Sequence, residues 1–190
     1  MEIINRDNSK VILYKNVIGG LFDKLKAEIT WKQEELVVFG KKCIPKRLRG
    51  SQSNSGLKYS YSGSQQESTE FTSTVLLIKK FLEETYGAKI TYCLCNYYPD
   101  GNSSISYHRD DERDLVEGDG IYSVSFGTKR KFYLKHNDGT VYKCNLEDGD
   151  VLIMEGETQK HFKHSVPIET KVHEARINLT FRNIVNKVTK

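Results

Sequence analysis

Features of secreted and membrane proteins are scarce in this sequence. Its 190 residues include four cysteines, too few for the disulfide framework of a small secreted domain. No apolar run is long enough for a secretory signal or a membrane span. We therefore expect an intracellular protein with reduced cysteines and no membrane partner. Nucleus and cytoplasm are not distinguished by the sequence.

The composition is that of one globular domain. Hydrophobic residues make up 37% of the chain, with eleven tyrosines and eight phenylalanines, and 190 residues can bury a proper core. We expect a monomer. The net charge of +4 is modest, but five cations crowd one short segment: Lys41, Lys42, Lys46, Arg47 and Arg49. Such a segment is either a solvated face or a surface that binds phosphate.

Periodicity changes near residue 89 and divides the chain into an N-terminal part, 1–89, and a core, 90–190. The pattern of the first part predicts a strand within 1–16, a helix over 17–31, a polar loop at 51–56 and a strand at 57–61. It also predicts a second helix, with Glu70 in its first turn and Gly87 as its C-terminal stop. Ser68 or Thr69 is expected to cap the second helix. The core predicts eight strands and no helix: 90–97, 104–108, 122–126, 130–135, 140–146, 150–155, 162–166 and 176–183.

Two helices followed by eight strands favour a mainly β fold with supporting helices, a jelly roll. Cys93 and Cys95 form a CxC pair that could bind a metal. Alternation along the predicted strand 90–97 explains this pair better than a metal site does.

The stretch 96–112, NYYPDGNSSISYHRDDE, contains the first candidate metal ligands, His108 and Asp110. In an extended strand residues i and i+2 share a face, so these two side chains can converge on one ion. A distal histidine would complete the facial triad of non-haem Fe(II) enzymes. His-Arg-Asp is also a protein-kinase tripeptide, but the kinase Gly-rich loop and Asp-Phe-Gly motif are missing.

The third ligand is sought in HFKHSVP, where His164 and His161 compete. If this segment is a strand, their odd spacing puts the two on opposite faces, so only one points inward. His136 and His173 stand in turn-like polar contexts and are expected to be solvated.

A strictly alternating segment, RINLTFR (176–182), carries two arginines on its polar face. This face is either the solvent side of an edge strand or an inward-facing site for a dicarboxylate, which arginine binds through both carboxylate oxygens. Together with nearby donors, the polar set is Asn96, Tyr98, Arg176, Asn178, Thr180 and Arg182. A triad beside a dicarboxylate site is the arrangement of Fe(II)/2-oxoglutarate oxygenases.

Four motifs in order, NxYxDGxxxxxxHxDDE, SVSFG, HxxHSVP and RxNLTFR, resemble the AlkB family of nucleic-acid dealkylating dioxygenases. The resemblance covers nearly the whole chain. VFGK (38–41), Pro45-Lys46 and LKYSYSG (57–63) resemble the animal-type branch that repairs double-stranded DNA. The resemblance implies a double-stranded β-helix preceded by helices, a hydrophobic finger and a nucleotide-recognition lid.

The family pattern implies a role for each matching residue. His108, Asp110 and His164 match the iron ligands, which favours His164 over His161. Asn96, Tyr98, Arg176, Thr180 and Arg182 match contacts to 2-oxoglutarate, with Arg182 on its distal carboxylate and Asn178 as support. Phe39, with Gly40 and Lys41, matches the finger; Tyr59, Ser60 and Tyr61 match the lid; Asp111 and Glu112 match an acidic pair near the flipped base. Tyr61 departs from the branch, which has phenylalanine there.

The function implied is oxidative removal of N-linked methyl groups, such as those of 1-methyladenine and 3-methylcytosine, with Fe(II), 2-oxoglutarate and O2. The finger favours duplex DNA as the substrate. An RNA demethylase of the same family is the alternative, because the sequence does not show whether a 2′-hydroxyl is tolerated. A non-catalytic jelly roll that holds DNA or a metal is a third reading, against which stands the complete set of triad and arginine positions.

Overall fold

The structure is a computed structural model that describes residues 1–33, 35–38, 41–54, 58–61, 64–111 and 114–185. In 36–38, 41–43, 58–61 and 64–67 it describes the backbone alone.

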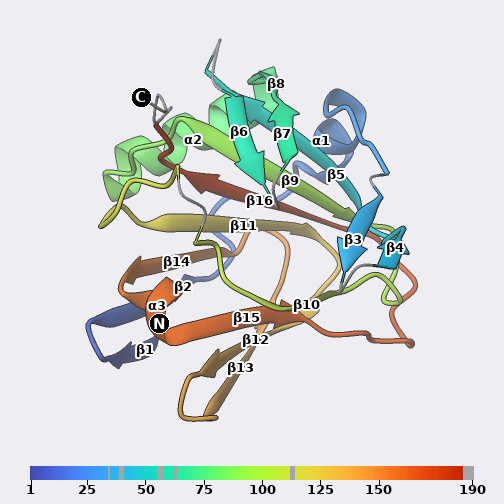
Figure 1. The fold of residues 1–190 in the computed structure, drawn as a ribbon. Coiled ribbons are helices and arrows are strands. Elements are labelled where there is room, and N and C mark those ends of the chain that lie inside the picture. The colour runs from blue at the N-terminus through green and yellow to red at the C-terminus, as the bar shows by residue number, and fades with distance from the viewer. Residues whose placement is uncertain (34, 39–40, 55–57, 62–63, 112–113, 186–190) are drawn as a thin grey trace.

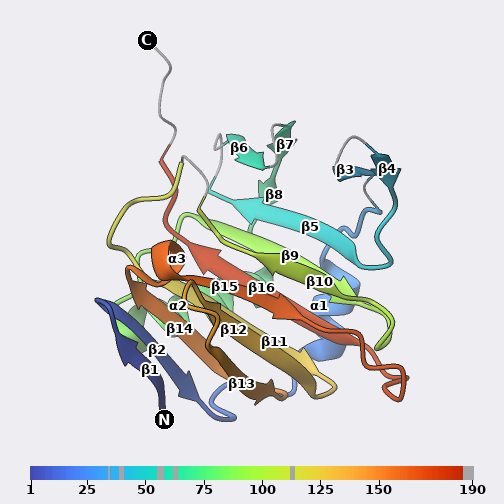
Figure 2. The same ribbon diagram turned by 60° about the horizontal axis from the view of Figure 1, so that its bottom comes forward.

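Two sheets face each other, and helices cover the outside of the larger one (Figures 1 and 2). The large sheet has the order β1 (Glu2–Arg6), β2 (Ser9–Tyr14), β14 (Val151–Gly156), β11 (Ile121–Gly127), β16 (Arg176–Arg182), β9 (Tyr92–Tyr98), β5 (Leu48–Ser53), β8 (Thr69–Glu70). The small sheet has the order β10 (Ile105–His108), β15 (Phe162–Val166), β12 (Arg130–His136), β13 (Val141–Leu146). Two further hairpins pair β3 (Leu36–Val38) with β4 (Lys41–Cys43) and β6 (Lys58–Tyr61) with β7 (Ser64–Glu67). The described helices are α1 (Phe22–Glu28), α2 (Ser73–Tyr86) and α3 (Thr158–His161).

Strand alternation divides the apolar side chains of the large sheet between two cores. On β16, Leu179 and its apolar neighbours pack toward the helices, in the same buried cluster as Leu25 of α1 and Ile78 of α2. On the other face of the sheet, Leu152 of β14 lies in a cluster with Phe132 of the small sheet. The polar residues of β16 therefore lie between the two sheets, because side chains alternate along a strand.

The mainly β prediction is confirmed. All eight strands predicted after residue 89 are present, with ends within two residues of the expected ones. Cys93 and Cys95 lie in strand β9, as predicted, and the structure buries both in the helix-side core. Strands from both sides of residue 90 share the large sheet. The sheet is thus continuous across the predicted boundary between N-terminal part and core, and that division stays a prediction about roles.

The prediction for the first 31 residues was wrong in detail. Two strands occupy 1–16 in place of one, because the chain reverses at Asp7 and Asn8, both of which have positive φ. The first helix begins at Phe22 and not at Val17, since Gly20 has φ of 75°, outside the helical region.

Residues 51–56 and 158–161 also differ from expectation. The predicted polar loop begins later, because β5 continues to Ser53 by pairing with β9. Thr69 does not cap the second helix: it pairs with Gln52 in a parallel bridge, and the helix begins at Ser73. Helix α3 was not predicted, since four residues are too few to show helical periodicity.

The N-terminus of α2 receives its cap from the neighbouring helix. No side chain of α2 caps its first turn. Instead, the Glu28 carboxylate accepts hydrogen bonds from the Thr74 amide at 2.9 Å and from the Thr74 hydroxyl at 2.6 Å. The Thr74 hydroxyl, followed by the Thr74 amide, lowers the pKa of Glu28 below its ordinary value. The carboxylate thus joins the two helices and meets the positive end of the α2 dipole.

Replacement of Glu28 by glutamine is expected to lower the free energy of unfolding at pH 7 by about 1 kcal/mol, since one charged acceptor at a helix start is lost. A lowered carboxyl pKa adds stability above the unfolded value, 4.5, and that stability is lost as pH falls through the folded value. The free energies of unfolding of the parent and of Glu28→Gln, measured with denaturant, should therefore become equal in acid. Glu84→Gln, an exposed change on α2, is the control. A difference that persisted in acid would contradict the carboxylate explanation.

Candidate metal centre and active site

Three potential metal ligands meet at one point between the two sheets. His108 of β10 lies directly opposite His164 of β15, and their ring centroids are 4.2 Å apart. Asp110 follows His108 by two residues, and its carboxylate oxygens lie 3.7 Å from Nε2 of each histidine. One ligand atom from each residue lies within 4.8 Å of the others. Two imidazoles and one carboxylate at these separations fit a non-haem iron.

The electrostatics of this cluster suit a divalent cation. Burial lowers the pKa of His164 to about 4, so its imidazole is neutral and can donate a lone pair. Burial alone would raise the pKa of Asp110, but Arg182 first, and then His164 and His108, bring it below its ordinary value. The Nδ1 atom of His108 lies 2.9 Å from the Ser106 carbonyl oxygen, which directs Nε2 toward Asp110.

The other histidines lie outside this cluster. His161 is the last residue of α3, so it does not stand in a strand as assumed, and its Nε2 lies 3.3 Å from Glu157. His173 is exposed, as predicted. The prediction for His136 was wrong: it is 9% exposed, between Asp7 at 3.1 Å and Asp138 at 2.9 Å. The β1–β2 and β12–β13 turns meet there, a contact that local sequence does not reveal.

Arg176 lies buried in the middle of the large sheet. Because β16 pairs with β11 on one side and β9 on the other, the edge-strand reading was wrong. Nη2 of Arg176 donates to Ser125 Oγ at 2.9 Å, and the guanidinium carbon lies 5.3 Å from the centre of the Tyr98 ring. Among the described residues its buried Nε and Nη1 have no hydrogen-bond partner. Burial lowers the pKa of Arg176, so this charge suits an anion that would pair with it.

The remaining polar residues of β16 continue this face toward the metal cluster. Asn178 Nδ2 donates to Ser123 Oγ at 2.8 Å, and the Thr180 hydroxyl donates to Asn178 Oδ1 at 3.1 Å. Arg182 places Nη2 3.2 Å from Oδ2 of Asp110. The two arginines thus have different surroundings: Arg182 is beside a metal ligand, and Arg176 is beside Tyr98.

Arg47 is a site residue that sequence reasoning assigned elsewhere. The segment 41–49 was expected to be a solvated or phosphate-binding face, but Arg47 and Arg49 are 5% and 2% exposed. Arg47 Nε donates to Asn96 Oδ1 at 3.2 Å. Arg47 also lines the cavity, about 30 Å³, that the metal ligands border. The pairing of β5 with β9 brings the segment 41–49 next to Asn96, and no local sequence pattern predicts that pairing.

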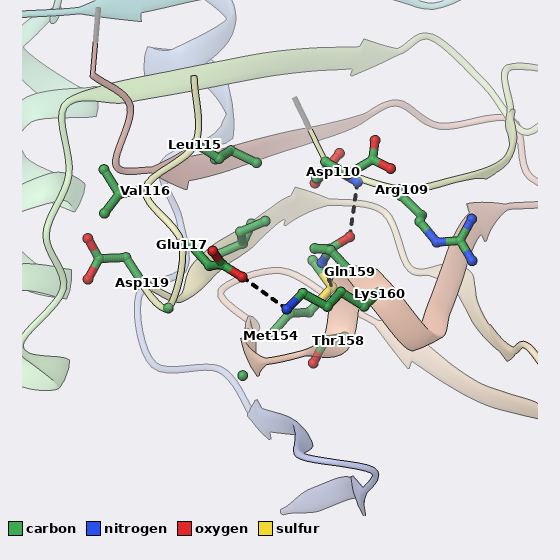
Figure 3. Close-up of a pocket in the computed structure, with 14 residues that line it drawn as sticks. Arg109, Asp110, Leu115, Val116, Glu117, Asp119, Met154, Thr158, Gln159 and Lys160 are labelled. Atoms are coloured by element: carbon green, nitrogen blue, oxygen red, sulfur yellow. Dashed lines mark hydrogen bonds and ion pairs between the residues drawn. The ribbon is translucent and has the colours of Figure 1, made fainter. Parts of the chain in front are cut away.

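A larger pocket of about 530 Å³ opens beside Asp110, between α3 and the loop 115–119 (Figure 3). Gln159 of α3 accepts a hydrogen bond from the Asp110 amide at 2.9 Å, and Lys160 forms an ion pair with Glu117 at 2.9 Å (Figure 3). Gln159 therefore fixes the backbone of a metal ligand, a role that depends on the unpredicted helix α3.

The residues expected to contact the substrate are placed only in part. Phe39, Gly40 and Glu112 lie outside the described residues. Lys41 lies in β4, and Tyr59, Ser60 and Tyr61 lie in β6, with their backbone alone described. Figure 2 shows both of these hairpins beyond β5, at one edge of the large sheet. Asp111 is exposed and lines the larger pocket.

The described residues contain no helix of the length and apolar character that a membrane span requires.

Comparison with known proteins gives one consistent family. The model of the 2OG-Fe(II) oxygenase superfamily matches residues 10–182. Human DNA oxidative demethylase ALKBH2 is 33% identical, over 94% of this chain and 74% of the relative. Bovine alpha-ketoglutarate-dependent dioxygenase alkB homolog 3 is 34% identical, over 86% of this chain and 60% of that relative. The uncharacterized protein R406 of Acanthamoeba polyphaga mimivirus is 32% identical, over 86% and 87%.

The solved structure of OsALKBH1 superposes with a TM-score of 0.62 at 18% identity, over 96% of this chain and all of that one, and shows the shared jelly-roll fold. With the family match, this makes His108, Asp110 and His164 candidate ligands of Fe(II) and the buried polar face of β16 a candidate site for 2-oxoglutarate. The chain belongs to the AlkB family of Fe(II)- and 2-oxoglutarate-dependent dioxygenases, the oxidative demethylases.

Proposed function

We propose that this protein reverses N-alkyl damage in DNA by removing the methyl groups of 1-methyladenine and 3-methylcytosine. The observation that carries the proposal is the cluster of His108, Asp110 and His164 beside buried arginines, in a chain that is 33% identical to a DNA oxidative demethylase. Bound iron, with 2-oxoglutarate and O2, supplies the oxidation of the N-linked methyl group, which leaves as formaldehyde while 2-oxoglutarate becomes succinate and CO2.

In this proposal the two carboxylates of 2-oxoglutarate meet different arginines. Arg176 and Tyr98 bind the distal carboxylate, since Arg176 has two buried donors without a partner among the described residues and, unlike Arg182, does not line the cavity that the metal ligands border. Arg182 stays with Asp110 and binds the metal-proximal end of the co-substrate. This revises the role of Arg182 that the family resemblance implied. Asn178 and Thr180 hold the polar face between these two ends through their hydrogen bonds.

Arg47 and Asn96 complete the proposed proximal end. The Arg47 Nε–H donates to Oδ1 of Asn96, so that, as far as the described residues go, the side-chain Nδ2 of Asn96 is free to donate into the cavity. Asn96 then directs a donor at the proximal carboxylate, and Arg47 adds positive charge beside it. Arg47 is thus a positioning residue for Asn96 as well as part of the anion site.

Arg47→Ala is expected to weaken 2-oxoglutarate binding at least about tenfold, the loss associated with a hydrogen bond to a charged group. Calorimetric titration of the Mn(II)-loaded protein with 2-oxoglutarate measures this directly. Lys46→Ala is the matched control, since Lys46 is the exposed neighbour of Arg47 in the same basic segment. If both variants bound 2-oxoglutarate like the parent, Arg47 would have no part in the site.

The substrate side of the proposal rests on the family pattern. Phe39, with Gly40 and Lys41, would wedge into the duplex beside the lesion, while Tyr59, Ser60 and Tyr61 form a lid over the flipped base. Asp111 and Glu112 would face that base. The protein would act as a single-domain monomer inside the cell, in the nucleus or the cytoplasm, with residues 1–89 supplying finger and lid and residues 90–190 the catalytic core.

The test is a side-by-side assay of methylated duplex DNA, single-stranded DNA and RNA of one sequence, with loss of the methyl group read by mass. The anaerobic protein is first loaded with Fe(II) and 2-oxoglutarate, then exposed to air. We expect demethylation to be fastest on the duplex, and Phe39→Ala to slow duplex more than single-strand repair. Activity confined to RNA would overturn the DNA substrate. Succinate formation without demethylation of any strand would overturn the proposed reaction.

A further inference from the structure

The outer face of the small sheet carries cations and aromatic rings that the active site does not use. Lys135 of β12, Lys143 of β13 and Lys163 of β15 are exposed, whereas the residues before and after each of them in its strand are buried or half-buried. Tyr107 of β10 is 40% exposed, and Tyr133 of β12 is half-buried. We call these five residues the outer patch.

Strand register brings the members of the outer patch together. Lys135 pairs directly with Lys163 across β12 and β15, and Tyr133 pairs with Lys143 across β12 and β13. Residues directly opposite in antiparallel strands project from the same face, and like charges in such a pair are destabilising. Facing lysines therefore cost stability here, which an anionic ligand would offset.

The charges of the outer patch lack carboxylate partners in the described part of the chain. None of its three lysines forms an ion pair there, whereas Lys131, on the same face, pairs with Glu169 at 3.6 Å. Two of the three lie near aromatic rings instead: Lys135 Nζ is 5.9 Å from the centre of the Tyr107 ring and Lys143 Nζ is 5.5 Å from that of Tyr133. Aromatic rings interleaved with uncompensated cations are the composition of surfaces that bind single-stranded nucleic acid.

The position of the patch connects it to the proposed substrate. Tyr107 directly precedes His108, and Lys163 directly precedes His164. Because side chains alternate along a strand, the metal ligands point between the sheets while the outer patch points away from them. A nucleic-acid strand bound on the outer patch would therefore be separated from the candidate metal ligands by the thickness of the small sheet.

We propose that the outer patch binds a single-stranded stretch of the nucleic acid, outside the duplex that holds the lesion. The lysines contact phosphates without reading sequence, and Tyr107 and Tyr133 offer ring faces to unpaired bases. This rests on the proposed function for the identity of the partner as a nucleic acid. Binding to the patch itself requires no metal and no catalysis.

The test is fluorescence anisotropy of a labelled, unmethylated oligothymidylate of roughly 12 nucleotides with the metal-free protein. Lys135→Glu/Lys163→Glu is expected to weaken binding at least about tenfold and to reduce the slope of log K against log salt by roughly 1.4, since two phosphate contacts are lost. The matched control is Lys24→Glu/Lys80→Glu, which changes two exposed lysines of α1 and α2 by the same charge. It should bind like the parent within about twofold.

Tyr107→Ala tests the aromatic part of the patch at constant charge. It should weaken binding about fivefold through lost stacking and leave the salt slope unchanged. Equal weakening by the two lysine double variants would mean that overall charge alone matters, and would overturn the proposal. So would a parent-like affinity of Lys135→Glu/Lys163→Glu. Because the assay uses metal-free protein and an undamaged strand, neither result depends on whether demethylation occurs.

Discussion

Replacement of His108 by alanine is expected to abolish turnover while the fold is retained. The imidazole is one of three clustered groups that could hold the metal, and the described residues place no other histidine in that cluster. Loss of a group that merely orients a metal ligand costs 10–100-fold, so loss of the ligand itself should lower activity at least about a hundredfold. The His108 side chain is 26% exposed, and its removal should change unfolding free energy by no more than about 1 kcal/mol.

Two measurements separate this effect from misfolding. Calorimetric titration with Mn(II) should show metal binding lost in His108→Ala, while thermal unfolding of the metal-free variant stays near that of the parent. His161→Ala is the matched control: it removes the histidine that competed with His164 in the sequence, and it should keep both metal binding and turnover. Activity of His108→Ala near the parent level would disprove the iron site as assigned.

Replacement of Arg176 by methionine is expected to reduce 2-oxoglutarate affinity on the order of a hundredfold, the loss expected for hydrogen bonds to a charged group. The same change should not destabilise the ligand-free protein. Arg176 is 1% exposed, and burial lowers its pKa because the charged form is poorly solvated. Since the described residues give it no carboxylate partner, a methionine of similar shape should leave unfolding free energy equal or raise it by about 1 kcal/mol.

Arg182→Met provides the contrast. Arg182 is the main group that keeps the pKa of Asp110 low. Its loss should raise that pKa, so protons should displace Mn(II) at a higher pH than in the parent, whereas Arg176→Met should bind Mn(II) like the parent. Thermal unfolding with and without 2-oxoglutarate reports whether each variant still binds the co-substrate, because a ligand that binds the folded state raises the midpoint temperature of unfolding. If Arg182→Met lost 2-oxoglutarate binding but bound Mn(II) like the parent, and Arg176→Met kept both ligands, the distal carboxylate would belong to Arg182.

The local pattern of the sequence was sufficient for the strands after residue 89 and for which residues of a strand share a face. Alternation in RINLTFR separates Arg176 and Arg182 from Leu179, and the structure places these sets on opposite faces of β16. Alternation also placed Cys93 and Cys95 in a strand. Such a pattern survives folding because the side-chain period of a strand is fixed by backbone geometry.

Contacts between distant segments were beyond the sequence. Arg47 reads as one of five surface cations, and only the pairing of β5 with β9 brings it onto Asn96. The sequence around His136 predicts a solvated side chain, but in the structure the β1–β2 and β12–β13 turns enclose it. The sequence by itself determined the strand pattern after residue 89, the candidate ligands and the family. Tertiary structure decided which arginine lies beside Asp110, which lies beside Tyr98, and which lysines gather on one outer face. Strand register across the sheets sets those distances, and no local pattern encodes that register.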